Sequence, residues 1–251
     1  MGQRVTAVAS QNPRYTIVAA LESANHPAIG QDAGLIAGVK PLGIPIGVVG
    51  EIDADVVIDF SVPDAAVAVT KHCLDYHKPL VIATTGLEAD QQQFIRDAAR
   101  SIPMVWAPSM STAVNVAMKL TEIAAQSLKE LPSGVDVEII ERHHRFKEDS
   151  PSGTALRFGQ IVAEQMGQTG HIHGRQGRPG KRPQNEIGYH AVRTGDNPGE
   201  HTIIFGMLGE VLEIRVAASN RDCYAQGALL AAEWLLGKPP GLFSMNDVLG
   251  L

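Results

Sequence analysis

The stretch that decides the fold covers residues 56–86 and reads VVIDFSVPDAAVAVTKHCLDYHKPLVIATTG. Apolar runs at residues 56–60 and 79–86 flank a helical pattern at residues 64–76. Runs that are apolar at nearly every position indicate strands buried on both faces. A helix between two such strands is typical of a parallel α/β unit. The stretch therefore predicts part of a parallel sheet covered by helices.

The same pattern extends along the first half of the chain. Residues 88–101 predict another helix, residues 103–109 another strand, and residues 14–21 an earlier strand. Turn-forming or polar residues follow three of the apolar runs: Asp59 to Ser61, Thr84 to Gly86 and Ala107 to Ser109. Because ligands of open α/β sheets lie beyond the carboxyl ends of the strands, these three ends predict a ligand crevice.

The pattern changes near residue 112. Residues 115–131 predict an amphipathic helix, residues 135–144 a strand and residues 154–166 a second helix. Three strands then follow without helices between them: IGYHAVRTG (187–195), HTIIFGML (201–208) and VLEIRVAAS (211–219). Consecutive strands favour an antiparallel or mixed sheet, so we predict a second domain of α+β type. We expect the apolar helix at 223–237 to pack back on the first domain, which gives boundaries of 1–112 with 222–251, and 113–221.

The segment ERHHRFKEDSPSGTA, residues 141–155, concentrates groups that can carry protons. Alternation along a strand would place His143, Arg145 and Lys147 on one face and His144 on the other. Histidine titrates near neutral pH and can give or take a proton, while a lysine supplies a positive charge or a second proton. We therefore interpret His143 and Lys147 as a catalytic pair.

The end of this segment reads as a loop that leads into a helix. Backbone N–H groups of Gly153 and Thr154 at that helix start suit an anion, and a carboxylate or a phosphate fits equally well. The glycine-rich basic stretch at residues 173–183 leaves two alternatives open. It is either a solvated loop or a flap that brings Arg175, Arg178, Lys181 or Arg182 toward an anionic ligand.

Composition narrows the functional class. The chain has 251 residues, of which 44% are hydrophobic, and a net charge of −6. This acidic balance gives no support to a nucleic-acid partner. No apolar run is long enough to cross a membrane. Two distant cysteines, Cys73 and Cys223, indicate a reducing, cytoplasmic location and neither a disulfide framework nor a zinc site. No metal site is expected, because adjacent histidines on a strand diverge.

Residues 141–155 resemble the E-x-H-H-x-x-K-x-D-x-P-S-G-T-A signature of the dihydrodipicolinate reductases of diaminopimelate and lysine biosynthesis. Five other segments resemble family segments in the same order: VVIDFSVP, IATTG, APSMSTAVNV, RTGDNPGEHT and GLFSMNDVLGL. The resemblance implies a Rossmann-type cofactor domain joined to an α+β domain that binds substrate and builds a homotetramer. It also implies reduction of 4-hydroxy-tetrahydrodipicolinate, a small dicarboxylate, by NADH or NADPH.

The resemblance also implies roles for individual residues. It makes His143 the acid that protonates the substrate ring and Lys147 a second proton donor. The remaining matches are substrate-carboxylate binders at His144, Gly153 and Thr154, cofactor-lining residues at Ala83, Thr84, Thr85, Ala107, Pro108, Ser109 and Met110, and a pair near the active site at Arg221 and Tyr224. Glu22 is the acid expected to bind the adenosine ribose, and Ser23 after it, in place of a basic residue, leans toward NADH.

The start of the chain departs from the family pattern. A Rossmann unit places its ribose acid about 20 residues after the first glycine of a glycine loop, and counting back from Glu22 reaches residue 1. Residues 1–10 read as the first helix, so the first strand and most of the loop are expected to be missing. We therefore expect the strand at 14–21 to keep an unpaired edge or to shift against the strand at 56–60. We also expect a truncated chain with poor dinucleotide binding, and the alternative is a non-catalytic homologue that acts in binding or assembly.

Overall fold

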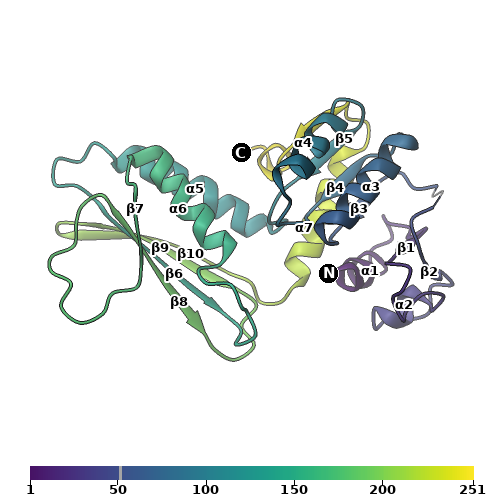
Figure 1. The fold of residues 1–251 in the computed structure, drawn as a ribbon, viewed down its shortest axis with the longest axis horizontal. Coiled ribbons are helices and arrows are strands. Elements are labelled where there is room, and N and C mark those ends of the chain that lie inside the picture. The colour runs from purple at the N-terminus through teal and green to yellow at the C-terminus, as the bar shows by residue number, and fades with distance from the viewer. Residues whose placement is uncertain (51–52) are drawn as a thin grey trace. The chain divides into compact units, whose positions relative to one another are not determined.

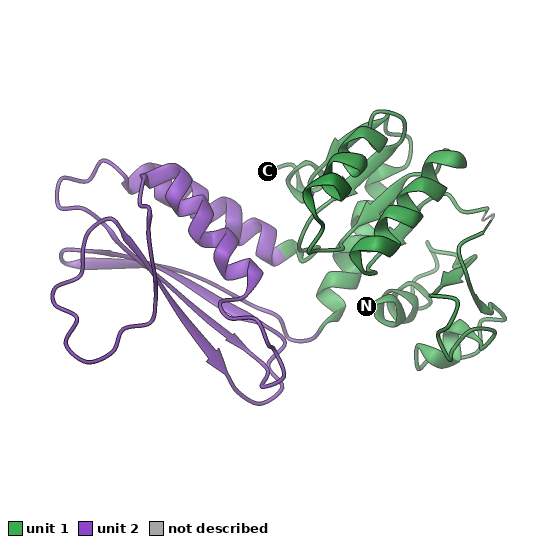
Figure 2. Ribbon diagram, in the orientation of Figure 1, with its two compact units in different colours: residues 1–112, 221–251 green, residues 113–220 purple. Residues whose placement is uncertain are grey.

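The computed structural model describes residues 1–50 and 53–251, which form two compact units (Figures 1 and 2). One unit contains residues 1–112 and 221–251, and the other contains residues 113–220. Each unit has its own sheet and its own buried core. No helix in the described part of the chain is long and apolar enough to cross a membrane.

The first unit is built on a four-stranded parallel sheet in the order β11-β5-β4-β3. The strands are β3 (Val57–Asp59), β4 (Leu80–Ile82), β5 (Pro103–Trp106) and β11 (Gly241–Phe243). Leu80 and Ile82 face helices α3 (Pro63–Asp75) and α4 (Ala89–Ala98), whereas Val81 faces the other side. That other side is covered by α7 (Asp222–Leu235) and α8 (Met245–Leu249). Burial on both faces explains why the strands read as continuous apolar runs.

Helix α7 lies close to the chain that follows β5. A Cβ atom added to Gly227 would lie 1.7 Å from the carbonyl oxygen of Met110. Only glycine permits this approach, so Gly227 lets α7 pack directly on the turn after β5. Helix α7 thus lies in the same compact unit as residues 1–112.

The start of the first unit differs from the predicted long strand. Helix α1 (Gly2–Ala9) is followed by β1, which includes only Ala20–Leu21 of the expected residues 14–21. Strand β1 pairs in parallel with β2 (Ile46–Gly47), and α2 (Ala33–Ile36) lies between them in the chain. Within residues 1–50 and 53–251, β1 pairs only with β2, and β3 pairs only with β4. The two parallel sheets are separate, and residues 14–19 lack the ladder partner that a strand requires.

The second unit contains a five-stranded mixed sheet in the order β10-β9-β6-β8-β7. Its strands are β6 (Asp136–His143), β7 (Gly170–His173), β8 (Glu186–Arg193), β9 (Glu200–Met207) and β10 (Glu210–Ala217). Helices α5 (Thr112–Leu128) and α6 (Gly153–Met166) pack on one face, where Ile139, Phe158 and Phe205 are fully buried. The predicted α/β class with a parallel sheet and a mixed sheet is confirmed.

The order of strands in this sheet was not fully predicted. Strands β8 and β9 are consecutive in the chain, but β6 lies between them and pairs in parallel with β8 and antiparallel with β9. The three consecutive strands are therefore not all neighbours in the sheet, although the sheet is mixed as predicted. Helix α6 returns the chain after β6, which allows the parallel pairing, and the loop at residues 194–199 carries it past β6. Strand β7 was not predicted either.

Candidate active site

Glu141 and His143 lie at the carboxyl end of β6, two residues apart on the face that α5 and α6 cover. The Glu141 side chain is fully buried, and the side chain of His143 is 10% exposed. Nδ1 of His143 lies 2.5 Å from Oε2 of Glu141. The predicted proton-carrying histidine is therefore held against a buried carboxylate.

Arg193, at the end of the neighbouring strand β8, completes this pair. The register places Arg193 beside His143, and its guanidinium donates to both oxygens of Glu141 over 2.7 and 2.8 Å. The backbone N–H of Ser152 also donates to Glu141 over 3.1 Å. Burial by itself would raise the pKa of Glu141, but the hydrogen bonds from Arg193 and His143 outweigh it and hold that pKa below its usual value. Glu141 is therefore a carboxylate at neutral pH.

The surroundings of His143 favour the neutral form of its imidazole. Burial lowers the pKa of His143 below its ordinary value, and the hydrogen bond and charge of Glu141 only partly oppose this shift. Because Glu141 accepts a hydrogen bond, Nδ1 carries the proton of the neutral ring. In the described part of the chain Nε2 of His143 has no hydrogen-bond partner. Nε2 is thus the atom available to a ligand.

A second histidine supports the start of α6. The Ser152 hydroxyl caps the helix by accepting from the Ala155 N–H, and it lies 3.1 Å from Nε2 of His201. His201 is only 4% exposed, and burial lowers its pKa to about 4. A neutral His201 can accept the Ser152 O–H, so the hydroxyl is fixed in both of its roles. The ring of His201 also lies edge-on to that of His143 at 5.3 Å.

Lys147 lies on a turn and not on the strand. Strand β6 ends at His143, and the Lys147 N–H donates to the carbonyl of His144. The expected shared face of His143, Arg145 and Lys147 is therefore wrong, because the chain turns before it reaches Arg145. Nζ of Lys147 lies 2.7 Å from Asp149, whose backbone carbonyl accepts from Arg193. Ion pairing thus connects Lys147 to the same cluster.

The other predicted substrate binders surround this cluster in sequence. Gly153 and Thr154 are the first two residues of α6, directly after the Ser152 cap. His144 is partly exposed, and its ring lies 6.2 Å from that of Phe146. The start of α6 therefore offers backbone donors beside the buried group of Glu141, His143 and Arg193.

The predicted cofactor residues lie in the first unit, at the carboxyl ends of strands. Ala83, Thr84 and Thr85 follow β4, and the Thr84 hydroxyl donates to the buried carboxylate of Asp59 over 2.5 Å. Residues 107–110 follow the adjacent β5, where the Ala107 N–H donates to Ile82. Pro108 is exposed, Ser109 is buried, and the side chain of Met110 belongs to the core under α7.

Glu22 lies apart from these two turns in the hydrogen-bonding pattern. It follows β1, in the separate two-stranded sheet, and is exposed. Its carboxylate accepts from the backbone N–H of Ser23 over 2.8 Å. Arg221 and Tyr224 lie at the start of α7. The sequence thus located the strand ends correctly, although they belong to two sheets.

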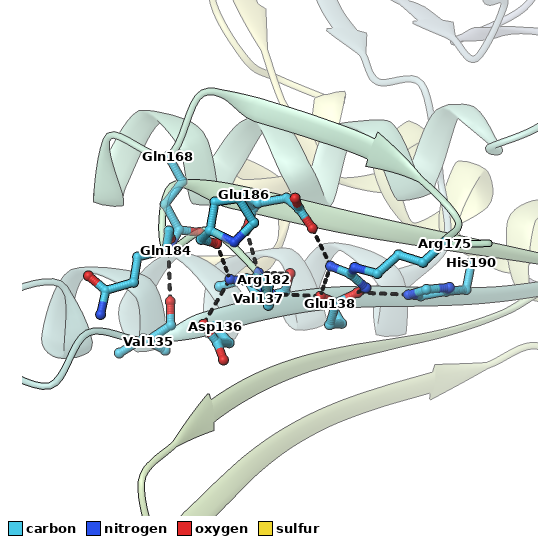
Figure 3. A network of polar contacts seen from close by, with 11 residues as sticks. Val135, Asp136, Val137, Glu138, Gln168, Arg175, Arg182, Gln184, Glu186 and His190 are labelled. Carbon is cyan, nitrogen blue, oxygen red and sulfur yellow. Dashed lines mark hydrogen bonds and ion pairs between the residues drawn. The ribbon is translucent and has the colours of Figure 1, made fainter. Parts of the chain in front are cut away.

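The basic stretch at residues 173–183 is bound to its own sheet (Figure 3). Arg175 donates to both oxygens of Glu138 on β6, over 2.7 and 3.0 Å, and also pairs with Glu186. Arg182 donates to Glu138 over 2.9 Å and to Asp136 over 2.8 Å. Two of the four basic side chains considered for an anion-binding flap are therefore neutralised by carboxylates.

No group of three or more potential metal ligands occurs in residues 1–50 and 53–251.

Comparison with known proteins decides the family. Residues 1–110 match the N-terminal part of dihydrodipicolinate reductase, and residues 113–249 match its C-terminal part. The chain belongs to the dihydrodipicolinate reductase family.

Relatives with similar sequences cover the whole chain. A 4-hydroxy-tetrahydrodipicolinate reductase of Rhodopirellula baltica is 54% identical over all of this chain and 92% of its own length. The enzyme of the same name from Syntrophotalea carbinolica is 43% identical, over all of this chain and 95% of its own. A dipicolinate-bound dihydrodipicolinate reductase from Paenisporosarcina sp. TG-14 has the same fold, with a TM-score of 0.75 and 24% identity, over 98% of this chain and 94% of that chain.

Membership confirms the family that the sequence predicted. The family consists of NAD(P)H-dependent oxidoreductases of lysine and diaminopimelate biosynthesis that act on a dicarboxylate, and its N-terminal domain binds the dinucleotide. The predictions of an enzyme and of NADH or NADPH as its cofactor are confirmed at this level.

Sequence reasoning missed four members of the polar cluster: Glu141, Ser152, Arg193 and His201. Each lay in a segment already singled out, since Glu141 and Ser152 occur in ERHHRFKEDSPSGTA and the other two in RTGDNPGEHT. Only the pairing of β6 with both β8 and β9 brings these segments together. The usable signal was the charged residue that opens each segment, Glu141 in one and Arg193 in the other.

Proposed function

We propose that this chain reduces 4-hydroxy-tetrahydrodipicolinate to tetrahydrodipicolinate with NADH or NADPH, in the cytoplasm. The observation that carries the proposal is His143, held by a buried carboxylate beside the backbone donors at the start of α6. A dicarboxylate needs backbone or cationic donors for its oxygens and an acid for its ring, and this cluster offers both. Full-length relatives that carry this enzyme name support the same reaction.

The first unit supplies suitable residues for the dinucleotide. Glu22 follows β1 with an exposed carboxylate for the ribose hydroxyls, and the turns after β4 and β5 end on one edge of a parallel sheet. Ala83, Thr84, Thr85 and residues 107–110 are proposed to line the nicotinamide end. When bound, NAD(P)H supplies the hydride. Glu22 followed by Ser23, and not by a basic residue, favours NADH over NADPH.

The second unit is proposed to bind the substrate and supply protons. The N–H groups of Gly153 and Thr154, with His144, would hold a carboxylate. His143 gives a proton to the substrate ring from Nε2, and Lys147 is the second donor. Because burial lowers the pKa of His143, a bound dianion is needed to raise it again and load the ring with a proton. Substrate binding and protonation are thereby coupled.

The test is a steady-state assay with the enzymatically generated substrate and either NADH or NADPH, together with a fluorescence titration of NADH. Oxidation of NADH that requires substrate supports the reductase. A chain that binds dipicolinate but neither binds nor oxidises NAD(P)H would instead be the non-catalytic binding or assembly homologue. The ratio of kcat/KM values for the two cofactors decides the preference attributed to Glu22.

We also propose a homotetramer assembled through the mixed sheet. The face opposite α5 and α6 exposes apolar side chains, among them Ile140 at 36%, Val192 at 40% and Val211 at 61%. Such a face on three strands of one sheet suits contact with another copy. Light scattering at micromolar concentration tests this, and a stable monomer would contradict it.

A further inference from the structure

The pair of Glu141 and Arg193 has a chemical consequence for His143. A buried carboxylate adjacent to an imidazole can decide which ring nitrogen carries the proton and how the ring is oriented. We propose that Glu141, fixed by Arg193, is a positioning residue that keeps the proton of neutral His143 on Nδ1 and leaves Nε2 to exchange protons with the substrate. This inference rests on the proposed role of His143 as the acid.

The geometry supports a fixed carboxylate. The Oε2 atom lies 2.5 Å from Nδ1 of His143, and both oxygens accept from Arg193 over 2.7 and 2.8 Å. The Ser152 N–H occupies Oε1 as well. Bidentate pairing with a guanidinium restricts a carboxylate in plane and in rotation. Glu141 therefore has little freedom to move away from the imidazole.

Burial of Glu141 keeps water from competing for Nδ1 of His143. The Glu141 side chain is fully buried, and that of Arg193 is 20% exposed. Water cannot replace the carboxylate at Nδ1, so the tautomer follows from the protein and not from solvent. Arg193 and the Ser152 N–H keep Glu141 ionised, which it must be to accept from both His143 and Arg193.

The proton transfer is balanced without a further reactant. In the imidazolium form, both nitrogens carry a proton, and the Nε2–H bond breaks as the proton passes to the substrate. The ring is left neutral with its Nδ1–H still bonded to Glu141, which does not change its own protonation. Without the negative charge of Glu141, the imidazolium would be less stable and the neutral ring could adopt the other tautomer.

The chain offers a matched control on the same strand. Glu138, three residues before Glu141, also pairs with arginines, Arg175 and Arg182, and with a histidine, His190, at 2.7 Å. It lies on the opposite face of β6 and touches no residue proposed for the site. Glu138→Gln therefore removes a carboxylate of similar surroundings without altering the support of His143.

The first measurement is the tautomer of His143 in the unmodified, unliganded protein, from nitrogen-15 chemical shifts with His143→Gln used to assign the signal. We expect neutral His143 with its proton on Nδ1. A proton on Nε2 would overturn the proposal. This result does not depend on enzyme activity, so it remains decisive if the proposed reaction proves wrong or if Glu141→Gln fails to fold.

The second measurement compares Glu141→Gln with Glu138→Gln. We expect Glu141→Gln to lower kcat roughly 10²-fold with a much smaller change in KM, and to shift the high-pH limb of the kcat profile to lower pH. Glu138→Gln should keep kcat and the midpoint of that limb. Equal losses in the two variants, or an unshifted midpoint in Glu141→Gln, would show that Glu141 is merely structural and would overturn the proposal.

Discussion

Glu138 and Glu141 are two glutamates on one strand that form similar contacts with different consequences. Each accepts from arginine and from histidine, but Glu138 lies on the face that the loop at 174–185 crosses, and Glu141 lies under α6. Arginine and histidine contacts hold the pKa of Glu138 down to about 2 against the effect of burial. The histidine paired with Glu138 is partly exposed, whereas the one paired with Glu141 is buried. The two ion pairs are alike, so it is the position of Glu141 beside His143 and the start of α6 that separates a candidate site from a structural contact.

The strongest test of this comparison replaces each histidine. His143→Gln should lower kcat roughly 10²- to 10⁴-fold and change substrate affinity far less, because it removes the proposed acid. His190→Gln, which removes the histidine paired with Glu138, should leave kcat unchanged. Steady-state kinetics over a pH series measures both. Parental turnover and pH dependence in His143→Gln would rule out its role.

Acid should weaken the second unit through His201. The pKa of this buried histidine is about 4 in the folded protein, whereas an exposed histidine has a pKa of about 6.5, so the unfolded chain binds more protons between these pH values. The free energy of unfolding therefore falls as the pH falls from 6.5 to 4, by about 3 kcal/mol from this group.

Hydrogen exchange of the β6 amides, corrected for the intrinsic rate at each pH, measures that loss. His201→Gln should flatten the dependence in this window. At pH 8, where His201 is neutral, any difference in stability between His201→Gln and the parent comes from packing. The further difference that develops below pH 6.5 comes from the titration of His201. An equally steep dependence in the variant would assign the acid sensitivity to other groups.

Removing Glu138 should cost stability and not activity. Glu138→Gln leaves Arg175 and Arg182 without their shared carboxylate, which we expect to destabilise the second unit by about 1–3 kcal/mol. The loop at 174–185 should become easier to cleave, because both arginines attach it to the sheet (Figure 3). Limited proteolysis and the same exchange measurement check this. An unchanged cleavage rate would show that the remaining pairs, Arg175 with Glu186 and Arg182 with Asp136, hold the loop without Glu138.

The smallest effect is expected at Lys147. Lys147→Ala removes a cation proposed to face the dicarboxylate and should weaken substrate binding roughly tenfold, with some loss of kcat, since a charge-assisted hydrogen bond contributes about 1.5–3 kcal/mol. Lys119→Ala is the control, because Lys119 forms a comparable ion pair with Glu122 on α5. Equal KM values for Lys147→Ala and the parent would reject the assignment.

The sequence by itself determined the elements and the reactive segment. Strands β3, β4 and β5 could be predicted from the sequence, because burial on both faces requires an apolar residue at almost every position. The start of α6 could be predicted because residues 149–153 read as a loop, and such turn signals depend only on neighbouring residues in the chain. His143 stood out through its neighbours in sequence, and the family signature extended that local information to most of the predicted site residues.

Tertiary structure decided which segments meet. Nothing within residues 141–155 indicates that Arg193 ends beside His143, because that contact comes from the register of β6 against β8. The insertion of β6 between β8 and β9 likewise placed His201 behind Ser152, and the turn after His143 removed Lys147 from the strand. Helix caps and apolar periodicity are local features, because each depends only on residues that are close together in the chain. Strand order and register result from the burial of the whole core, and so the partners of Glu141 appear only once the sheet is assembled.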